Sequence, residues 1–215
     1  MLNYPFANSY NVEFATTYST LLGQPKWNSF DLQVTPEWSV TPHVDLMGAL
    51  YMSRTFQNES LTTNEYREML GARIHFTPNK RILSRLLVRL EHRSLEDTEA
   101  DTWTQSTRSR LRVETLTPLN RKSMYEDKLW YAIVDAEVFI VNDKDVHERF
   151  ANRLRVRGGV GYRISYGLRV EVIYMVQRSR NETTDGSLST DNIFRFRIKQ
   201  YLHRAKPSTA TGTGN

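Results

Sequence analysis

Two residues of this sequence have the types and the spacing for nucleophilic catalysis. His92 and Ser94 lie two positions apart, and on an extended strand this spacing places both side chains on one face. A serine hydroxyl with an imidazole base beside it can attack a lipid ester. No Asn-Gly pair follows Ser94, however, and the sequence assigns no third member of a triad. Lipid hydrolysis by His92 and Ser94 therefore stays an alternative, and we predict no catalytic residue.

Neither metal ligands nor a phosphate-binding loop can be recognised. The histidines have no partner at ligand spacing, and the acidic group Asp143, Asp145 and Glu148 lacks the glycine of a calcium loop. Gly158, Gly159 and Gly161 lie inside an expected strand, where they more plausibly admit a bulky side chain or a neighbouring strand. We predict no metal site and no cofactor. The scattered histidines are His43, His75, His92, His147 and His203.

The basic charge calls for a different explanation from nucleic-acid binding. The formal net charge is +5 and the pI is about 9.4, but 22 arginines stand against 7 lysines. The planar fork of arginine suits fixed, partly buried carboxylate pairs better than lysine does. Carboxylates interrupt most of the arginine rows, and the aromatic residues fall largely on the opposite face. We therefore expect internal ion pairs and no nucleic-acid partner.

Length and composition restrict the elements that can position these charges. The chain has 215 residues, enough for one domain, with 39% hydrophobic and 25% charged residues and a mean hydropathy of −0.56. The most apolar run, Leu129–Val141, contains Asp135 and Glu137, so no helix of the roughly 18 apolar residues needed to cross a membrane is predicted. No cysteine is present. Transmembrane strands give a weaker hydropathy signal and are not excluded.

Residues of two kinds alternate along most of the chain, which is typical of strands with two different faces. Between Asn152 and Ile164 one row is apolar and the other is rich in arginine and glycine. A turn at Ser165-Tyr166-Gly167 and a second alternating run, Leu168–Gln177, complete a hairpin. Similar runs occupy residues 65–77, 83–93, 102–114, 130–140 and 194–199, and three further strands are expected over residues 12–22, 28–35 and 44–57. The sequence predicts an all-β, antiparallel, up-and-down barrel of about ten strands.

The connections between these strands differ in character. Turn chemistry is found at Thr35-Pro36, Thr77–Lys80, Thr117–Asn120 and Ser165–Gly167. The other connections, residues 57–63, 95–101, 142–148 and 179–191, are polar and mostly longer. Short turns at one end and long loops at the other are typical of barrels in bacterial outer membranes.

Three observations favour a transmembrane barrel, with the apolar rows facing outward, over a soluble ligand-binding barrel. The apolar rows are long enough to cross a bilayer, they mix bulky and small residues, and the polar rows carry both signs of charge. We predict an ion-pair network in the lumen and an aromatic girdle outside. The network comprises Arg89, Glu91, Arg110, Arg112, Glu114, Asp135, Glu137, Arg153, Arg155, Arg157, Arg169, Glu171, Arg195 and Arg197; the girdle comprises Tyr66, Trp103, Trp130, Tyr162, Tyr174 and Phe194.

Several of these runs resemble an uncharacterised family of bacterial outer-membrane barrels. The resemblance covers Pro36 to His203 and rests on Arg108–Glu114, Trp130–Glu137, Phe150–Arg157, Gly159–Arg163 and Leu168–Gln177. It implies a transmembrane barrel and no established activity. One departure is the end of the chain, where Tyr201-Leu202-His203 is followed by a polar tail, because outer-membrane barrels usually end on an aromatic residue.

We therefore expect one barrel domain, residues 1–203, a disordered tail, residues 204–215, and no export signal in this chain. The expected location is the bacterial outer membrane, with the bilayer, lipopolysaccharide and, through the loops, other envelope proteins as partners. The expected function is a non-enzymatic, structural or partner-binding component of an envelope complex. A narrow anion-preferring pore, the lipid hydrolase and a soluble ligand-binding barrel are the alternatives. Residues Leu2–Tyr10 fit either a plug-side segment or part of the first strand.

Overall fold

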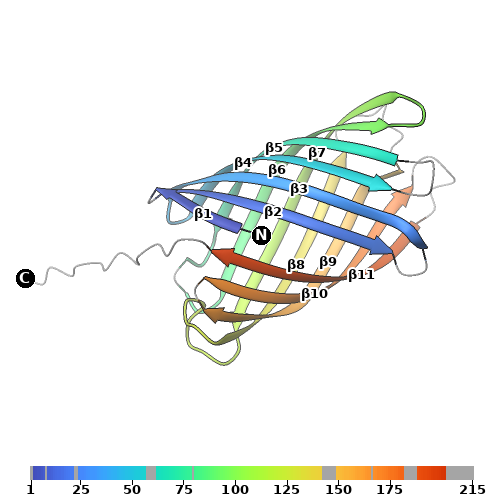
Figure 1. Cartoon of the computed structure of the whole chain (residues 1–215). Coiled ribbons are helices and arrows are strands. Elements are labelled where there is room, and N and C mark those ends of the chain that lie inside the picture. Colours follow the sequence, from blue (N-terminus) through green and yellow to red (C-terminus); the bar gives the residue numbers. More distant parts are fainter. Residues whose placement is uncertain are drawn as a thin grey trace, which may run out of the picture.

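The computed structural model of the chain describes residues 2–7, 9–21, 24–56, 62–78, 80–141, 149–165, 167–181 and 188–201. In these residues eleven strands form one sheet that curls into a barrel (Figure 1). The strands are β1 Leu2–Ala7, β2 Tyr10–Leu21, β3 Gln24–Thr41, β4 Val44–Phe56, β5 Thr62–His75, β6 Leu83–Asp97, β7 Thr102–Pro118, β8 Leu129–Val141, β9 Arg149–Ser165, β10 Leu168–Asn181 and β11 Leu188–Tyr201. The described part of the chain contains no helix long and apolar enough to span a bilayer.

The ten long strands, β2 to β11, follow one another around the barrel, and each is antiparallel to the next. This confirms the predicted fold, an antiparallel up-and-down barrel of about ten strands. The reason is the period-two pattern, which gives most of the long strands an apolar outer row and an inner row rich in polar residues. The predicted tail, residues 204–215, lies outside the described residues.

The N-terminal segment, whose place the sequence left open, forms a strand of its own. β1 lies between β2 and β11 (Figure 1). It pairs antiparallel with β2 from Leu2 opposite Phe14 to Ala7 opposite Tyr10. Among the described residues, it pairs parallel with β11 through Leu2 opposite Gln200 and Asn3 opposite Tyr201. The sheet therefore closes through β1 at one end, and β2 and β11 form no ladder with each other.

The turn predicted at Thr35-Pro36 is wrong. β3 continues through both residues to Thr41, and the reversal comes at Pro42 and His43, between β3 and β4. Pro36 has no backbone N–H to donate, and the ladder to β4 lacks the pairs of Thr35 and Pro36 while its register resumes unchanged at Glu37 opposite Met47. A proline can thus interrupt one ladder without ending the strand.

The predicted difference in length between the two ends of the barrel is also wrong for the described connections. We call the end that holds residues 42–43, 76–82 and 119–128 the turn end, and the opposite end the loop end. Residues 119–128 form the longest described connection, although a short turn was predicted there. At the loop end, β6 and β7 continue to Asp97 and from Thr102, so only residues 98–101 join them. This hairpin projects beyond its neighbours (Figure 1).

The two faces of the strands lie in opposite environments. In β8, Tyr131, Ile133 and Phe139 point inward and are buried, whereas Val134 and Val138 point outward and are 59% and 40% exposed. The buried polar residues include Glu91, Glu137 and Arg163, and the exposed residues include large apolar side chains on every strand from β2 to β11. The barrel therefore has a charged interior and an apolar outer surface.

Candidate functional site

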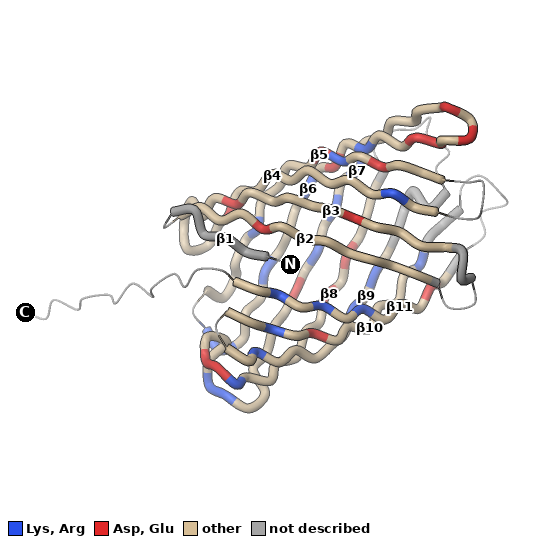
Figure 2. The backbone as a smooth tube through the Cα atoms, in the orientation of Figure 1, with Lys and Arg blue, Asp and Glu red and all other residues tan. Residues whose placement is uncertain are grey.

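The charged residues of the inward rows form the candidate site, because they are the largest group of chemically active side chains that the fold gathers. Basic and acidic positions recur along the strands that surround the lumen (Figure 2). Alternation aims every second residue inward, and neighbouring strands bring rows of opposite sign side by side. For example, Glu137 of β8 lies opposite Arg112 of β7 and Arg155 of β9.

Glu91 of β6 is the centre of one cluster. Its side chain is fully buried. Oε1 accepts hydrogen bonds from Nε and Nη2 of Arg89 at 2.9 and 2.5 Å. Oε2 accepts one from Nε of Arg108 at 2.6 Å, and Nη1 of Arg110 lies 3.4 Å from Oε1. One carboxylate thus holds three guanidinium groups, which offsets the cost of burying it.

Glu137 of β8 joins this cluster to the next. It is fully buried and pairs with Arg110, while Nη1 of Arg155 and Nη2 of Arg157 each lie 3.5 Å from its Oε2. Arg157 also donates from Nε to Asp135 at 2.6 Å. Because Arg110 contacts both Glu91 and Glu137, these ion pairs connect β6, β7, β8 and β9.

An aromatic ring packs inside this network. Phe139 is 2% exposed, and the guanidinium carbons of Arg108, Arg110 and Arg155 lie 4.7, 5.1 and 4.7 Å from its centroid. Cations over a ring face are attracted by the ring quadrupole. Phe139 therefore fills space between the guanidinium groups and stabilises cations that outnumber the nearby carboxylates.

Towards the turn end, Glu114 and Glu171 are the centres of two further ion-pair clusters. Glu114 pairs with Arg85 and accepts a hydrogen bond from Nη2 of Arg112 at 2.5 Å. Glu171 accepts from Nε of Arg197 at 2.6 Å and from the hydroxyl of Tyr131 at 2.7 Å. Nζ of Lys199 lies 3.3 Å from Glu171. The carboxylates of β7 and β10 therefore anchor cations of their own or an adjacent strand, and Glu171 also holds the hydroxyl of Tyr131 from β8.

Gly161 makes room for Tyr131 in this region. A Cβ atom added at Gly161 would collide with the Tyr131 ring. The predicted role of the glycines in this strand, to admit a bulky side chain or a neighbouring strand, is confirmed here. It also holds at Gly159, where an added Cβ would lie 2.5 Å from the carbonyl oxygen of Val172 in β10.

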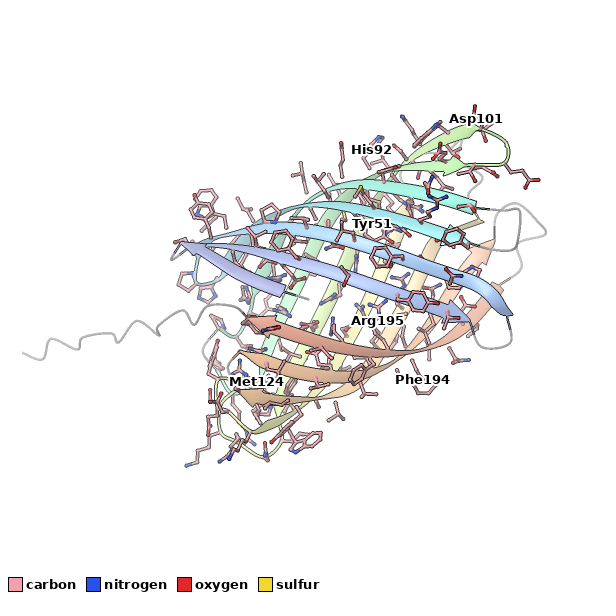
Figure 3. All side chains as sticks on the ribbon, viewed as in Figure 1. Tyr51, His92, Asp101, Met124, Phe194 and Arg195 are labelled. Atoms are coloured by element: carbon pink, nitrogen blue, oxygen red, sulfur yellow. The ribbon has the colours of Figure 1, made fainter. Side chains whose placement is uncertain are left out.

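Two adjoining cavities remain in the turn-end half and the middle of the lumen. The cavity at the turn end has a volume of about 620 Å³, and Met124 of the 119–128 connection folds inward over it (Figure 3). The second, of about 330 Å³, lies along β2 and β11. Both are lined by Arg85, Glu114, Arg197 and Lys199, so cationic side chains stand between them.

A family model described as a protein of unknown function (DUF2490) matches residues 1–187. The chain belongs to this family. The match confirms the resemblance to an uncharacterised family and extends it to the N-terminal strands. No curated protein and no solved structure matches the chain. The DUF2490 assignment therefore adds no activity, and function must be argued from the geometry of the lumen and the outer surface.

Most of the predicted lumen residues come together in the structure of this DUF2490 member. Two of them do not join the network as predicted, and a third lies outside the described side chains. Arg169 lies with its guanidinium carbon 4.7 Å from the Tyr201 ring centroid instead of on a carboxylate. Among the described residues, Arg195 makes no hydrogen bond or ion pair, and the Arg153 side chain lies outside the described set.

Sequence reasoning missed a second group of ion pairs on β3 to β6. Glu37 holds Arg73 at 2.7 Å, Asp45 lies 2.7 Å from Nε2 of His75, and Glu65 accepts from Nη2 of Arg67 at 2.5 Å. Glu65 also accepts from Nε of Arg93 at 2.6 Å. The alternation in β5 and β6 predicts that these arginines face inward. Glu37 was missed because the turn predicted at Thr35-Pro36 placed it outside any expected strand. Arg108 and Lys199 lie in predicted rows and were also left out.

The six predicted girdle residues are on the outer surface in three contacting pairs. Tyr66 stacks on Trp103, with ring centroids 5.9 Å apart, near the loop end. Trp130 and Tyr162 lie 4.7 Å apart near the turn end, where Tyr10 also stacks on Trp38. The centroids of Tyr174 and Phe194 lie 5.1 Å apart, near the middle of β10 and β11 instead of at their ends.

His92 and Ser94 lie on the outer face of β6, on the apolar side of the wall. His92 is exposed (Figure 3), and in the described part of the chain no hydrogen bond joins it to Ser94. The residue pair therefore lies away from the charged lumen, and no carboxylate of the network can orient the imidazole.

Proposed function

We propose that this protein is a bacterial outer-membrane β-barrel with a lumen closed by ion pairs, and that it acts without catalysis as a structural or partner-binding component of an envelope complex. The observation that carries the proposal is the sidedness of the wall, with charged side chains buried inside and apolar side chains exposed outside. A soluble ligand-binding barrel would have the opposite sidedness.

The apolar outer surface supports contact with lipid. Leu70 is 72% exposed and Leu90 is 56% exposed, on adjacent strands in the middle of the sheet. Contiguous apolar patches larger than a few hundred Å² are rare on soluble monomers and mark interaction surfaces. The strands β2 to β11 have 12 to 18 residues, more than the roughly 9–11 that a tilted strand needs to cross a bilayer.

The aromatic pairs support the same orientation. Tyr10–Trp38 and Trp130–Tyr162 lie near the turn end, and Tyr66–Trp103 lies near the loop end. Aromatic rings concentrate at the two interfaces of a bilayer, where the ring is partly in lipid and its polar atom meets water. The lipid bilayer and lipopolysaccharide are accordingly the proposed partners of the outer surface, and the polar connections at the rim are the proposed contacts for other envelope proteins.

The ion-pair network in the lumen favours a role as a scaffold instead of a role as a channel. Glu91 and Glu137 are fully buried and each contacts three arginines. A buried carboxylate and its guanidinium partners are stable only while they remain together. An ion moving through this region would have to break those pairs, so we expect the lumen to stay closed.

Cell fractionation tests the proposal. The exported chain, expressed in a bacterium with an outer membrane, should sediment with that membrane, resist alkaline carbonate extraction and require detergent for release. Unheated samples should also migrate differently from heated ones in dodecyl sulfate gels, as folded membrane barrels do. A chain that remains soluble and monomeric without detergent would contradict the proposal and favour the soluble ligand-binding barrel.

A second candidate, the narrow anion-preferring pore, is favoured by the two adjoining cavities and the cations between them, since rings of arginine select anions. Planar-bilayer recording separates the two functions. We expect no steady conductance from the purified protein. Reproducible anion-selective steps that disappear when the protein is omitted would favour the pore and contradict the closed scaffold.

A further inference from the structure

The wall of the barrel is not sealed between its first long strand and its last. β1 pairs with β2 only as far as Phe14 and with β11 only at Gln200 and Tyr201. Beyond it, Ala15–Leu21 of β2 faces Leu188–Arg197 of β11, and no ladder joins these two stretches. We call this region the seam. An unjoined edge is costly in a hydrocarbon environment, so a seam in a membrane barrel calls for an occupant.

The 330 Å³ cavity opens through the seam. Its lining includes outward-facing residues of both strands, Thr16 and Tyr18 of β2 and Phe196 of β11. It also includes the inward-facing Thr17 and Arg195. Because the cavity is lined by residues from the inner and the outer faces of β2 and β11, it passes through the wall between these two strands. Its volume is that of a small-ligand pocket, and it connects the lumen sideways with the apolar outer surface.

The inner part of this cavity is strongly cationic. Nine arginine or lysine side chains line it against three carboxylates, Glu13, Glu37 and Glu114. Most of these cations have partners in the network. Arg195 has none among the described residues, and the charges that act on it most strongly, those of Arg197 and Arg157, are also positive. An anion in the cavity would therefore supply the partner that Arg195 lacks.

The outer part of the seam is apolar. Phe194, Phe196 and Tyr18 are 76%, 67% and 69% exposed, and Phe194 and Arg195 lie on opposite sides of β11 (Figure 3). Threonines alternate with aromatic residues along the outer face of β2, at Thr16 and Thr20. From the outside of the seam to the inside, the surface thus changes from apolar side chains, through hydroxyl groups, to cationic side chains.

We propose that the seam is a lateral binding site for an anionic phospholipid, whose phosphate enters the cavity beside Arg195 while its acyl chains remain on the apolar surface of β2 and β11. The proposal rests on the membrane location proposed above. Charge complementarity and the small volume favour a phosphate headgroup over the other occupant that an open sheet edge admits, an extended peptide strand. A peptide would satisfy the backbone edges but would leave the excess positive charge unexplained unless it carried inward carboxylates.

Native mass spectrometry of the purified barrel tests the site. The protein in detergent micelles is titrated with dioleoyl phosphatidic acid, with dioleoyl phosphatidylcholine and with inorganic phosphate alone. We expect one phosphatidic acid per barrel to be retained and phosphatidylcholine to be lost. Arg195→Gln should weaken phosphatidic acid binding about tenfold or more, because a charge-assisted hydrogen bond is removed.

Arg178→Gln is the matched control, since Arg178 is an exposed cation on the outer face of β10. It should leave binding unchanged. Equal losses in both variants would mean non-specific attraction of headgroups and would overturn the proposal. So would displacement of the lipid by inorganic phosphate, or a co-purifying peptide in place of lipid. Equal retention of both lipids by a protein that fractionates with the membrane would refute the site but not the proposed function.

A charge-reversal variant guards against misfolding as the cause of lost binding. Arg195→Glu places a carboxylate near Arg157 and Arg197, whose charges act on this position. The variant should fold, resist thermal unfolding at least as well as the parent, and bind no phosphatidic acid. A stable Arg195→Glu variant that still binds phosphatidic acid with parental affinity would overturn the proposal.

Lateral entry is tested with acyl-chain quenching. The chain has no cysteine, so a bimane on Tyr18→Cys reports on the seam, and one on Leu90→Cys reports on the outer face of β6, across the barrel. Phosphatidic acid with a spin label on its acyl chain should quench the label at position 18 more than the label at position 90. Spin-labelled phosphatidylcholine should quench both alike. Equal quenching by phosphatidic acid would contradict a seam site.

Discussion

At the scale of single residues, the buried carboxylates decide whether the interior is stable. Glu91 and Glu137 are each in contact with three arginines, and Arg110 is shared between them. Removing one carboxylate leaves several cations together without a counter-charge, which costs far more than the pair itself contributes. Phe139 can compensate only partly, because cation–π attraction is weaker than a charge-assisted hydrogen bond.

Glu137→Ala should therefore destabilise the barrel by about 3–5 kcal/mol, measured as the free energy of unfolding in denaturant. Glu99→Ala, at an exposed position between β6 and β7, is the control and should change this free energy by less than about 0.5 kcal/mol. If Glu137→Ala were as harmless as Glu99→Ala, the network would not be a stabilising element of the lumen.

At the scale of elements, the sequence pattern predicted strands well and their ends poorly. Alternation over residues 130–140 predicts β8, Leu129–Val141, to within one residue at each end, because the two faces of the strand lie in different environments. The end predicted at Pro36 was wrong, because a proline can pair with the strand on one side, here β2, and interrupt only the ladder on the other side, here β4. The 119–128 connection was misjudged because the inward placement of Met124 depends on a barrel mouth that local sequence does not reveal.

The contact between β8 and β9 gives a prediction at this scale. Gly161→Ala should destabilise the barrel by about 1–3 kcal/mol, because the added methyl group would displace the buried Tyr131 ring and its hydrogen bond to Glu171. Gly158→Ala, in the same strand, is the matched control, since an added Cβ there meets no atom within 4 Å. Thermal unfolding of the two variants should differ; equal stabilities would mean that Tyr131 does not need the space at Gly161.

At the scale of the whole molecule, the low mean hydropathy of −0.56 conceals two opposed surfaces. The excess of arginine belongs to the lumen, as its alternation with apolar residues predicted. The same pattern could not reveal the seam, because the placement of β1 between β2 and β11 depends on long-range closure. Nor could it show that Arg195 has no ionic partner among the described residues, since its row reads like those of its neighbours.

The proposed membrane location requires that the outer face of the barrel lies in lipid. Because the chain contains no cysteine, single cysteines in β8 can carry a bimane at Val134 and Val138, which are 59% and 40% exposed, or at Ile133 and Phe139, which are 1% and 2% exposed. The variants are reconstituted in phosphatidylcholine vesicles that contain a spin-labelled lipid. We predict strong quenching at positions 134 and 138 and weak quenching at 133 and 139. Equal quenching at all four positions, or stronger quenching at 133 and 139, would contradict a membrane barrel with a charged lumen.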